Sequence, residues 1–203
     1  MSRPDPAAAP LSPAAEPFPA GPADAAVVAA QLGRSPRGQF SVAHRCRCGQ
    51  PDVIRTAPRL PDGTPFPTLY YLTCPRAAAA AGRLEASGTM AAMTARLAAD
   101  PGLRQDYQAA HEDYLARRDA AARAAGVEPL PAGTQSAGGM PVRVKCLHAL
   151  IAHELAVPGV NPLGEEAAAA AGAWWEAGPC VPRPAGPDSP ESPGAGEHRP
   201  KEH

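Results

Sequence analysis

The sequence predicts an α+β fold, in which a small antiparallel three-stranded sheet is followed by a layer of about four helices. Three observations lead to this prediction. Stretches typical of β-strands, QFSVAHRC, DVIRT and TLYYLT, fall in the first half of the chain. From Pro75 onward, apolar residues recur at steps of three and four, as they do in amphipathic helices. Both ends of the chain are rich in proline and alanine and nearly lack large apolar residues.

The chain divides into one domain and two tails. It contains 27 prolines and 19 glycines among its 203 residues, and these gather at the ends. Residues 1–23 and 176–203 cannot bury enough apolar surface to offset the entropy of ordering, so we expect disordered tails there. Residues 24–175 are the expected single α+β domain, and this length can bury most of its apolar surface in one core.

Charge and hydropathy argue against two classes of partner. The chain has 19 basic and 20 acidic residues, and a formal net charge of -1 provides no general attraction for nucleic acid. No apolar run reaches the ~18–20 residues that span a bilayer, and the N-terminus does not resemble a signal peptide. We therefore expect a cytoplasmic protein without a membrane span, whose five cysteines stay reduced.

The first elements are a short helix and the strands. The helix is expected from Asp24, as N-cap of AAVVAAQL, to Gly33, which ends it. In QFSVAHRC, alternation places His44 and Cys46 on the same face as the apolar residues of the strand. GQPD then forms a turn, DVIRT a second strand and TLYYLT a third. The proline-rich connection APRLPDGTPFP either crosses an edge of the sheet or forms an ordered loop.

The helices follow the third strand. Pro75 comes after Cys74 and suits the first position of a helix, and Gly88 ends that helix. A short helix comes next, and Asp100 caps a long one that runs towards Gly126.

A final helix is expected over VRVKCLHALIAHELA, opened by Pro141. At about 100° per residue, His148 lies on the border of its apolar stripe, while Cys146 and His153 lie on the opposite side. Because Cys146 and His153 are two turns apart, about 10.5 Å along the axis, they are poorly spaced to share one metal ion. GVNPLGEE, which follows, is expected to form a turn.

The cysteines predict a zinc site. The first and third strands of a meander run the same way, so Cys46 and Cys48 emerge at the same end of the sheet as Cys74. The helices would supply the remaining ligand, Cys146 or alternatively His148, His153 or His111. Thiolates and imidazoles in a reduced compartment favour tetrahedral zinc. In the competing interpretations the thiols are small buried hydrophobes, or Cys74 is a nucleophile or redox centre at a helix N-terminus.

A second candidate site precedes the final helix. In SAGGMPVRVK, Gly138 and Gly139 leave backbone N–H groups open to an anion, and Arg143 and Lys145 add positive charge. The pattern is compatible with a bound phosphate or carboxylate. Alternatively, the glycines only permit a tight entry to the helix, since no Walker or dinucleotide motif is present.

Several segments together resemble a known family. VAHRCRCGQPDVI, RLPDGTPFPTLYYLT, AAHEDYLARRD and GGMPVRVKCLH resemble the actinobacterial domain-of-unknown-function family five hundred and one, over about residues 24–166. The resemblance implies an actinobacterial protein of no established activity, often encoded near a septum formation initiator, with a possible link to cell division. The family pattern matches at Cys46 and Cys146 and varies at Cys48 and Cys74, which implies that a histidine completes the site in some relatives.

Two functions are compatible with these features. The first is a regulatory or protein-interaction domain stabilised by zinc, acting on an unknown protein partner. The alternative is a small-molecule enzyme that binds a phosphorylated or carboxylated ligand at the Gly138–Gly139 helix start, with His153 or Cys146 in the pocket. A closed metal site with four ligands favours the first function. An open metal position beside a pocket favours the second.

Overall fold

The computed structural model of the chain describes residues 18–182. Its elements are α1 (Pro22–Leu32), β1 (Phe40–Arg45), β2 (Pro51–Thr56), β3 (Tyr70–Leu72), α2 (Pro75–Ala86), α3 (Thr89–Ala99), α4 (Pro101–Ala124), α5 (Leu147–Ala156) and α6 (Pro162–Ala171). The α+β fold class and the three-stranded antiparallel sheet are confirmed. In the described part of the chain, one more helix follows the sheet than expected, because GVNPLGEE begins α6 instead of forming only a turn.

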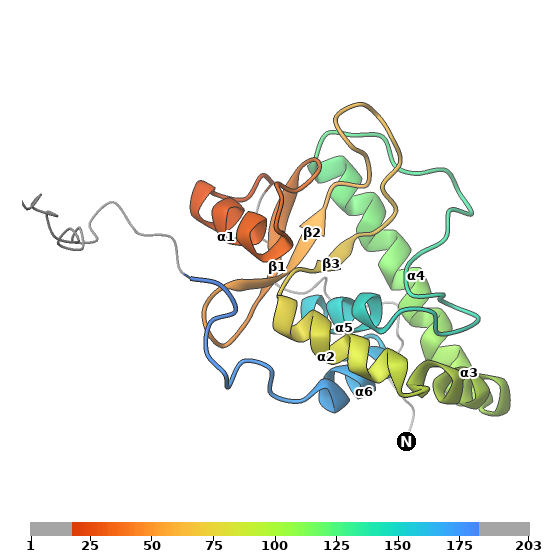
Figure 1. Cartoon of the computed structure of the whole chain (residues 1–203). Coiled ribbons are helices and arrows are strands. Elements are labelled where there is room, and N and C mark those ends of the chain that lie inside the picture. The colour runs from red at the N-terminus through yellow and green to blue at the C-terminus, as the bar shows by residue number, and fades with distance from the viewer. Residues whose placement is uncertain (1–17, 183–203) are drawn as a thin grey trace, which may run out of the picture.

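The sheet carries helices on both faces. Its strands lie in the order β1-β2-β3, and each is antiparallel to its neighbour. Successive side chains of a strand point to opposite faces. Accordingly, Val53 of β2 joins the main core with α2, α4 and α5, whereas Ile54 packs with Phe40 and with Val28 of α1. Figure 1 shows α1 on one side of the sheet and α2 with α5 on the other.

The proline-rich connection between β2 and β3 is an ordered loop. Its two arms meet at an isolated bridge between Arg59 and Pro65. Nε of Arg59 donates to the carbonyl of Glu128 at 2.9 Å, and the Leu69 N–H donates to the hydroxyl of Tyr114 on α4 at 2.6 Å. These bonds attach the loop to α4 and its following segment while the chain returns to form β3.

The starts of α2 and α4 agree with the prediction, and that of α1 differs. α2 begins at Pro75, and the Asp100 side chain caps α4 by accepting two backbone N–H groups of its first turn at 2.8 and 3.1 Å. The N-cap of α1 is Gly21. Asp24 lies in the first turn of α1, where its carboxylate accepts from the guanidinium of Arg45 at 2.7 and 2.8 Å. An ion pair to β1 therefore takes the place of the predicted cap.

The helix expected to start at Pro141 is α5, which begins at Leu147, so its predicted start is wrong. The preceding residues form a loop that is closed by a hydrogen bond from the Lys145 N–H to the carbonyl of Gly138 at 2.6 Å. Gly138, which precedes the predicted start, has a φ of 64°, in the left-handed region, and this conformation lets the chain turn back so that the loop can close. Backbone N–H and carbonyl groups of this segment therefore form hydrogen bonds within the loop rather than within a helix.

The predicted tails, residues 1–23 and 176–203, lie mostly outside the described residues. Their described parts lie against the domain. The Ala20 N–H donates to a carbonyl of β1 at 2.7 Å, and the Gln50 amide donates to the carbonyl of Val181 at 2.8 Å. The segment after α6 thereby returns to the β1–β2 turn (Figure 1).

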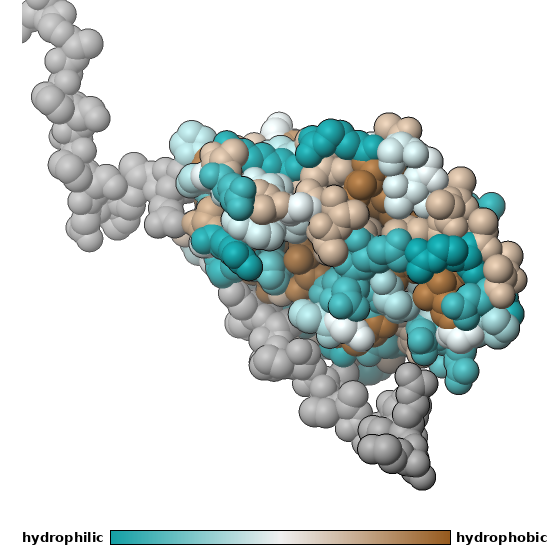
Figure 2. Space-filling model, turned by 90° about the horizontal axis from the view of Figure 1, so that it is seen from below, coloured by the Kyte–Doolittle hydropathy of each residue, from teal (hydrophilic) through white to brown (hydrophobic). Residues whose placement is uncertain are grey.

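The surface of the described residues is mixed. On the face seen from below, apolar residues form small separate patches between hydrophilic ones (Figure 2). The exposed large apolar side chains of the described residues are Tyr71, 38% exposed, and Val142, 76% exposed. None of the helices described here is long and apolar enough to cross a membrane.

Candidate metal site at the start of α5

Three potential metal ligands from two helices meet at the start of α5. Glu85 belongs to the last turn of α2, Cys146 is the N-cap residue of α5, and His148 follows in the first turn. Their ligand atoms all lie within 4.8 Å of one another. Across residues 18–182, no other set of three His, Cys, Asp or Glu side chains meets this limit. The three residues form a group that could hold a metal ion.

The members of this group also contact one another. Oε1 of Glu85 accepts from the Leu147 N–H at 2.6 Å and lies 3.0 Å from Nδ1 of His148. Burial opposes ionisation of Glu85, but the hydrogen bonds from His148 and Leu147 outweigh it and lower the pKa of the carboxyl group. Burial raises the pKa of the Cys146 thiol, and the negative charge of Glu85 adds to this increase. Without a cation, the group therefore combines a charged carboxylate with a protonated thiol.

A metal ion would change this balance, because a bound cation stabilises the thiolate and displaces its proton. The group offers one sulfur, one nitrogen and one oxygen ligand. Zinc binds all three types, at about 2.3 Å to cysteine and about 2.0–2.2 Å to histidine and carboxylate. Three protein ligands would leave a fourth position for water or another ligand, as in catalytic zinc sites.

Glu85 also has a structural role at this place. Its carboxylate satisfies the N–H of Leu147, one of the N–H groups that a helix leaves without an internal partner. Its negative charge lies at the positive end of the α5 dipole. A substitution that tests metal binding at Glu85 must therefore preserve the hydrogen bond to α5.

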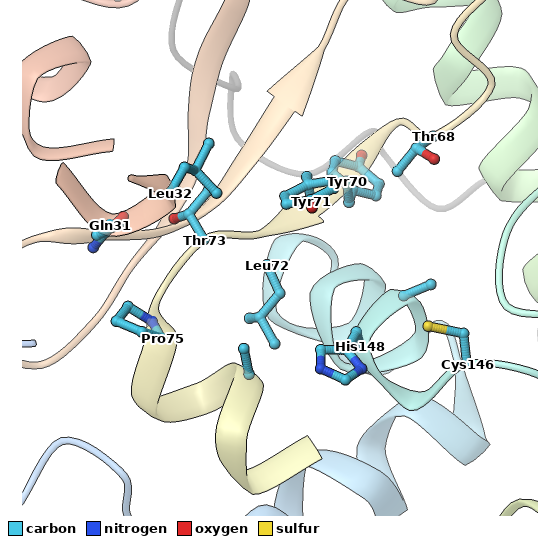
Figure 3. Close-up of a pocket in the computed structure, with 12 residues that line it drawn as sticks. Gln31, Leu32, Thr68, Tyr70, Tyr71, Leu72, Thr73, Pro75, Cys146 and His148 are labelled. Atoms are coloured by element: carbon cyan, nitrogen blue, oxygen red, sulfur yellow. The ribbon is translucent and has the colours of Figure 1, made fainter. Parts of the chain in front are cut away.

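A pocket with a volume of about 590 Å³ adjoins the candidate metal site. Figure 3 shows Cys146 and His148 at the α5 side of this pocket, and Gln31 and Leu32 of α1 at the far side. The walls between them are largely apolar, and none of the lining residues described is Arg, Lys, Asp or Glu. The pocket suits an uncharged, mostly apolar ligand.

Of the predicted set Cys46, Cys48, Cys74 and Cys146, only Cys146 belongs to the three-ligand group. The first three lie beyond the ends of β1 and β3, at the same end of the sheet, as expected from the meander. Cys46 is buried, and its thiol contacts that of Cys48. Burial is the main cause that raises the pKa of Cys46 to about 11. Cys146 lies instead where α5 meets the end of α2, and it is the one predicted cysteine in the three-ligand group.

Of the three histidines predicted as alternative ligands, only one belongs to the three-ligand group. His148 joins the group, whereas His153 has no exposed surface, with Nε2 lying 3.8 Å from the Asp113 carboxylate. His111 lies on α4, with Nδ1 at 2.8 Å from the Ser136 hydroxyl, and burial lowers its pKa. Neither His111 nor His153 is part of the three-ligand group.

The predicted anion site is not at a helix N-terminus, because α5 begins at Leu147 and not at Pro141. The Gly138 and Gly139 carbonyls accept hydrogen bonds from the Lys145 and Arg143 N–H groups, at 2.6 and 3.2 Å. A Cβ atom on Gly139 would lie 2.6 Å from the Arg143 carbonyl, so this glycine permits a close backbone approach. Arg143 and Lys145 are exposed. Anion binding by these four residues stays a prediction without a helix N-terminus to support it.

Sequence reasoning missed Glu85, the third member of the group. Its contact with α5 joins residues 62 positions apart. A glutamate in the last turn of a helix rich in alanine carries no sequence signal for such a contact. The position of Glu85 becomes informative only once α2 and α5 are packed together.

Comparison with known proteins identifies the family of this chain but assigns no activity to it. No curated protein and no solved structure gives a match to this chain. Residues 42–169 match the family described as protein of unknown function (DUF501). This range covers more than half of the chain and includes Glu85, Cys146 and His148. The chain therefore belongs to the DUF501 family.

Proposed function

We propose that this protein binds a zinc ion through Glu85, Cys146 and His148 and presents an open coordination position to a small molecule in the adjoining pocket. The observation that carries the proposal is the meeting of three different ligand atoms within 4.8 Å of one another, with Cys146 and His148 both lining the pocket. A buried structural metal would be expected to have four protein ligands.

The chemistry of the ligand set supports zinc over other common metals. Magnesium and calcium prefer oxygen ligands, and only Glu85 offers oxygen. Cysteine and histidine suit zinc or copper, and zinc also accepts a carboxylate oxygen beside them. The half-buried position of all three side chains leaves a route for solvent and ligand.

The pocket supports a neutral ligand. Zinc with an open position supplies Lewis-acid chemistry and lowers the pKa of a bound water to about 7. Leu72 and Pro75 provide apolar walls, while Gln31 and Thr68 provide polar groups for orientation. An uncharged ester or amide fits these walls better than the phosphorylated or carboxylated ligand predicted from the glycine-rich segment. Hydrolysis of such a substrate is the activity that this arrangement favours.

A regulatory or protein-interaction domain is the second candidate, and one observation favours it. The three ligands come from the end of α2 and the start of α5, so a metal ion would fasten these two helices together. In that case removal of the metal would lower the stability of the domain, and the pocket would need no ligand.

Zinc titration of the metal-free full chain tests the proposal. Isothermal titration calorimetry should give about one zinc ion per chain for the wild type. Cys146→Ser, His148→Gln and Glu85→Gln should each weaken binding more than ~10-fold. Glutamine is chosen at Glu85 because its amide oxygen still accepts from the Leu147 N–H and preserves the cap.

Cys48→Ser and His111→Gln serve as matched controls. Both side chains are half-buried and lie outside the three-ligand group. They should bind zinc as tightly as the wild type. Absence of binding in the wild type, or equal binding in all five variants, would contradict the proposal. Because zinc bound in either role raises the unfolding temperature, zinc-dependent hydrolysis of a neutral ester is the measurement that separates a ligand-binding site from a structural one.

A further inference from the structure

A second pair of thiols lies away from the candidate metal site. We infer that Cys74 and Cys180 form a reversible disulfide, which fastens the segment after α6 to the end of the sheet. Neither residue belongs to the three-ligand group, so this inference does not depend on metal binding. Cys180 also lies beyond residues 42–169, the range matched by the family.

The fold brings the two thiols together from distant parts of the chain. Cys74 ends the β3 segment as the N-cap residue of α2 and is only 2% exposed. Cys180 packs against the core cluster that contains Cys74, and the two side chains come close enough to interact. A hydrogen bond also joins Arg76, two residues after Cys74, to Gly178, two residues before Cys180. A disulfide needs a close approach of this kind, because its sulfur atoms must come within about 2.05 Å.

Several hydrogen bonds hold the segment around Cys180 in place. Arg76 lies in the first turn of α2, two residues after Cys74. Its Nη1 donates to the Gly178 carbonyl at 2.7 Å. The Gln50 amide donates to the carbonyl of Val181 at 2.8 Å. The Cys180 thiol itself donates to Oε1 of Gln50 at 3.4 Å. Figure 1 shows this segment running from α6 to the β1–β2 turn, which contains Gln50.

The surroundings of the two sulfurs suggest an order of reaction. Cys180 is half-buried, and its sulfur accepts a hydrogen bond from Nε2 of Gln31 at 3.3 Å. Cys74 is buried, and burial is the main cause that raises its pKa to about 12. The more accessible Cys180 should therefore react first with an oxidant, and Cys74 should react with the product.

Hydrogen peroxide is the oxidant proposed for this reaction. The Cys180 thiolate attacks one peroxide oxygen, the O–O bond breaks, and after protonation the products are a sulfenic acid and one water. The Cys74 sulfur then attacks the Cys180 sulfur, the S–O bond breaks, and the oxygen leaves as a second water with the Cys74 proton. Two thiols are oxidised to one disulfide, and one peroxide is reduced to two waters.

The disulfide would affect the pocket as well as the segment. Thr73 and Pro75, the neighbours of Cys74 in sequence, both line the pocket, and so does Gln31, which contacts Cys180. Oxidation would therefore fix the segment after α6 beside one wall of the pocket. Backbone amides of this segment should exchange hydrogen more slowly in the oxidised protein.

Peptide mapping of the full chain tests the inference. The reduced protein is treated with hydrogen peroxide, free thiols are blocked with iodoacetamide, and the digest is analysed by mass spectrometry without reduction. We expect a cross-linked peptide that joins Cys74 to Cys180, with the loss of two hydrogens, and its disappearance after dithiothreitol. Cys48→Ser is the control and should give the same cross-link.

Two variants keep the result interpretable. Cys180→Ser replaces a half-buried residue, and in this variant Cys74 should stay reduced and unmodified under the same peroxide treatment. Cys74→Ala should leave Cys180 as a sulfenic acid that a dimedone probe captures. A Cys46–Cys48 disulfide in place of the Cys74–Cys180 one, a disulfide between chains, or oxidation of Cys180 without a cross-link in the wild type would overturn the inference.

Discussion

Histidine residues on the same helix have different chemical roles in this protein. His148 lies in the first turn of α5, half-exposed, with Nδ1 at 3.0 Å from the Glu85 carboxylate. His153 lies on the same helix with no exposed surface, and its ring stacks on Tyr70 and meets the edge of Tyr114. An imidazole enclosed by two tyrosine rings contributes packing, whereas one beside a carboxylate at a pocket can bind a metal ion. Burial, not helix position alone, distinguishes the two.

Asp24 and Arg45 provide a prediction about acid stability. The hydrogen bonds from Arg45 are the main cause that lowers the pKa of Asp24. A carboxyl group with a lower pKa in the folded than in the unfolded chain stabilises the fold above its unfolded pKa, and this contribution is lost as pH falls through its folded pKa. Asp24→Asn should therefore destabilise the protein at pH 7 by less than about 1 kcal/mol, because the pair is partly exposed. The difference should vanish well below about pH 4.

Urea unfolding of wild type and Asp24→Asn at neutral and acidic pH measures this difference. Asp106→Asn on α4 is a matched control, because Asp106 is exposed. A destabilisation by Asp24→Asn that persists unchanged in acid would show that the ion pair to β1 is not its cause.

Single-residue predictions succeeded where local pattern decided the position. The sequence placed Cys74 at the end of a strand and before a helix that starts at Pro75, and the structure agrees. It could not place Glu85 beside Cys146, because that contact depends on how α2 and α5 pack. Cys180 was assigned to a tail from composition alone, although hydrogen bonds to Gln31 and Gln50 hold it against the domain.

At the scale of elements, the start of α5 decides which chemistry the molecule can perform. The sequence predicted a helix from Pro141, which would have placed Gly138 and Gly139 at a helix N-terminus. Propensity and periodicity favour a helix there, but the N–H groups of Arg143 and Lys145 bond to the carbonyls of Gly139 and Gly138, and the helix begins only at Leu147. This delay makes Cys146 the N-cap residue and brings its thiol next to Glu85.

Gly139→Ala tests the loop that sets this helix start. Gly139 has a φ of 93°, and an added Cβ would lie 2.6 Å from the Arg143 carbonyl. Gly133→Ala is the matched control, because Gly133 has a φ of 81° but nothing within 4 Å of an added Cβ. The control should cost about 1–2 kcal/mol for its backbone conformation. Gly139→Ala should cost about 1–3 kcal/mol more, because the crowded atom is backbone.

Chemical denaturation of the two alanine variants measures both costs. If they destabilise the protein equally, the close approach at Gly139 has no energetic effect. The loop would then have room to rearrange, and the position of Cys146 would not depend on it.

At the scale of the whole molecule, the order of elements could be predicted and their packing could not. Alternation, turn residues and helix caps are local signals, and they gave the three-stranded antiparallel sheet, the starts of α2 and α4, and the α+β class. The covering of one sheet face by α1 and the docking of α5 on α2 depend on contacts between distant residues. The candidate site formed by these contacts differs for that reason from the predicted four-cysteine set.

The pocket also belongs to this scale, because several elements build it. α1 contributes Gln31 and Leu32, β3 contributes Leu72, and the start of α5 contributes His148. A zinc ion held at one end would lie where a ligand in the pocket could reach its open position. The candidate metal site, the pocket and the Cys74–Cys180 pair thus lie around a single junction of sheet and helices.

The most direct test of the central claim is the X-ray absorption spectrum of zinc bound to the full chain. The proposed site predicts one sulfur neighbour at about 2.3 Å and nitrogen or oxygen neighbours at about 2.0–2.2 Å. In Cys146→Ser the sulfur contribution should disappear. A zinc environment of three or four sulfur atoms would contradict this account and would return the metal to the cysteines at the end of the sheet.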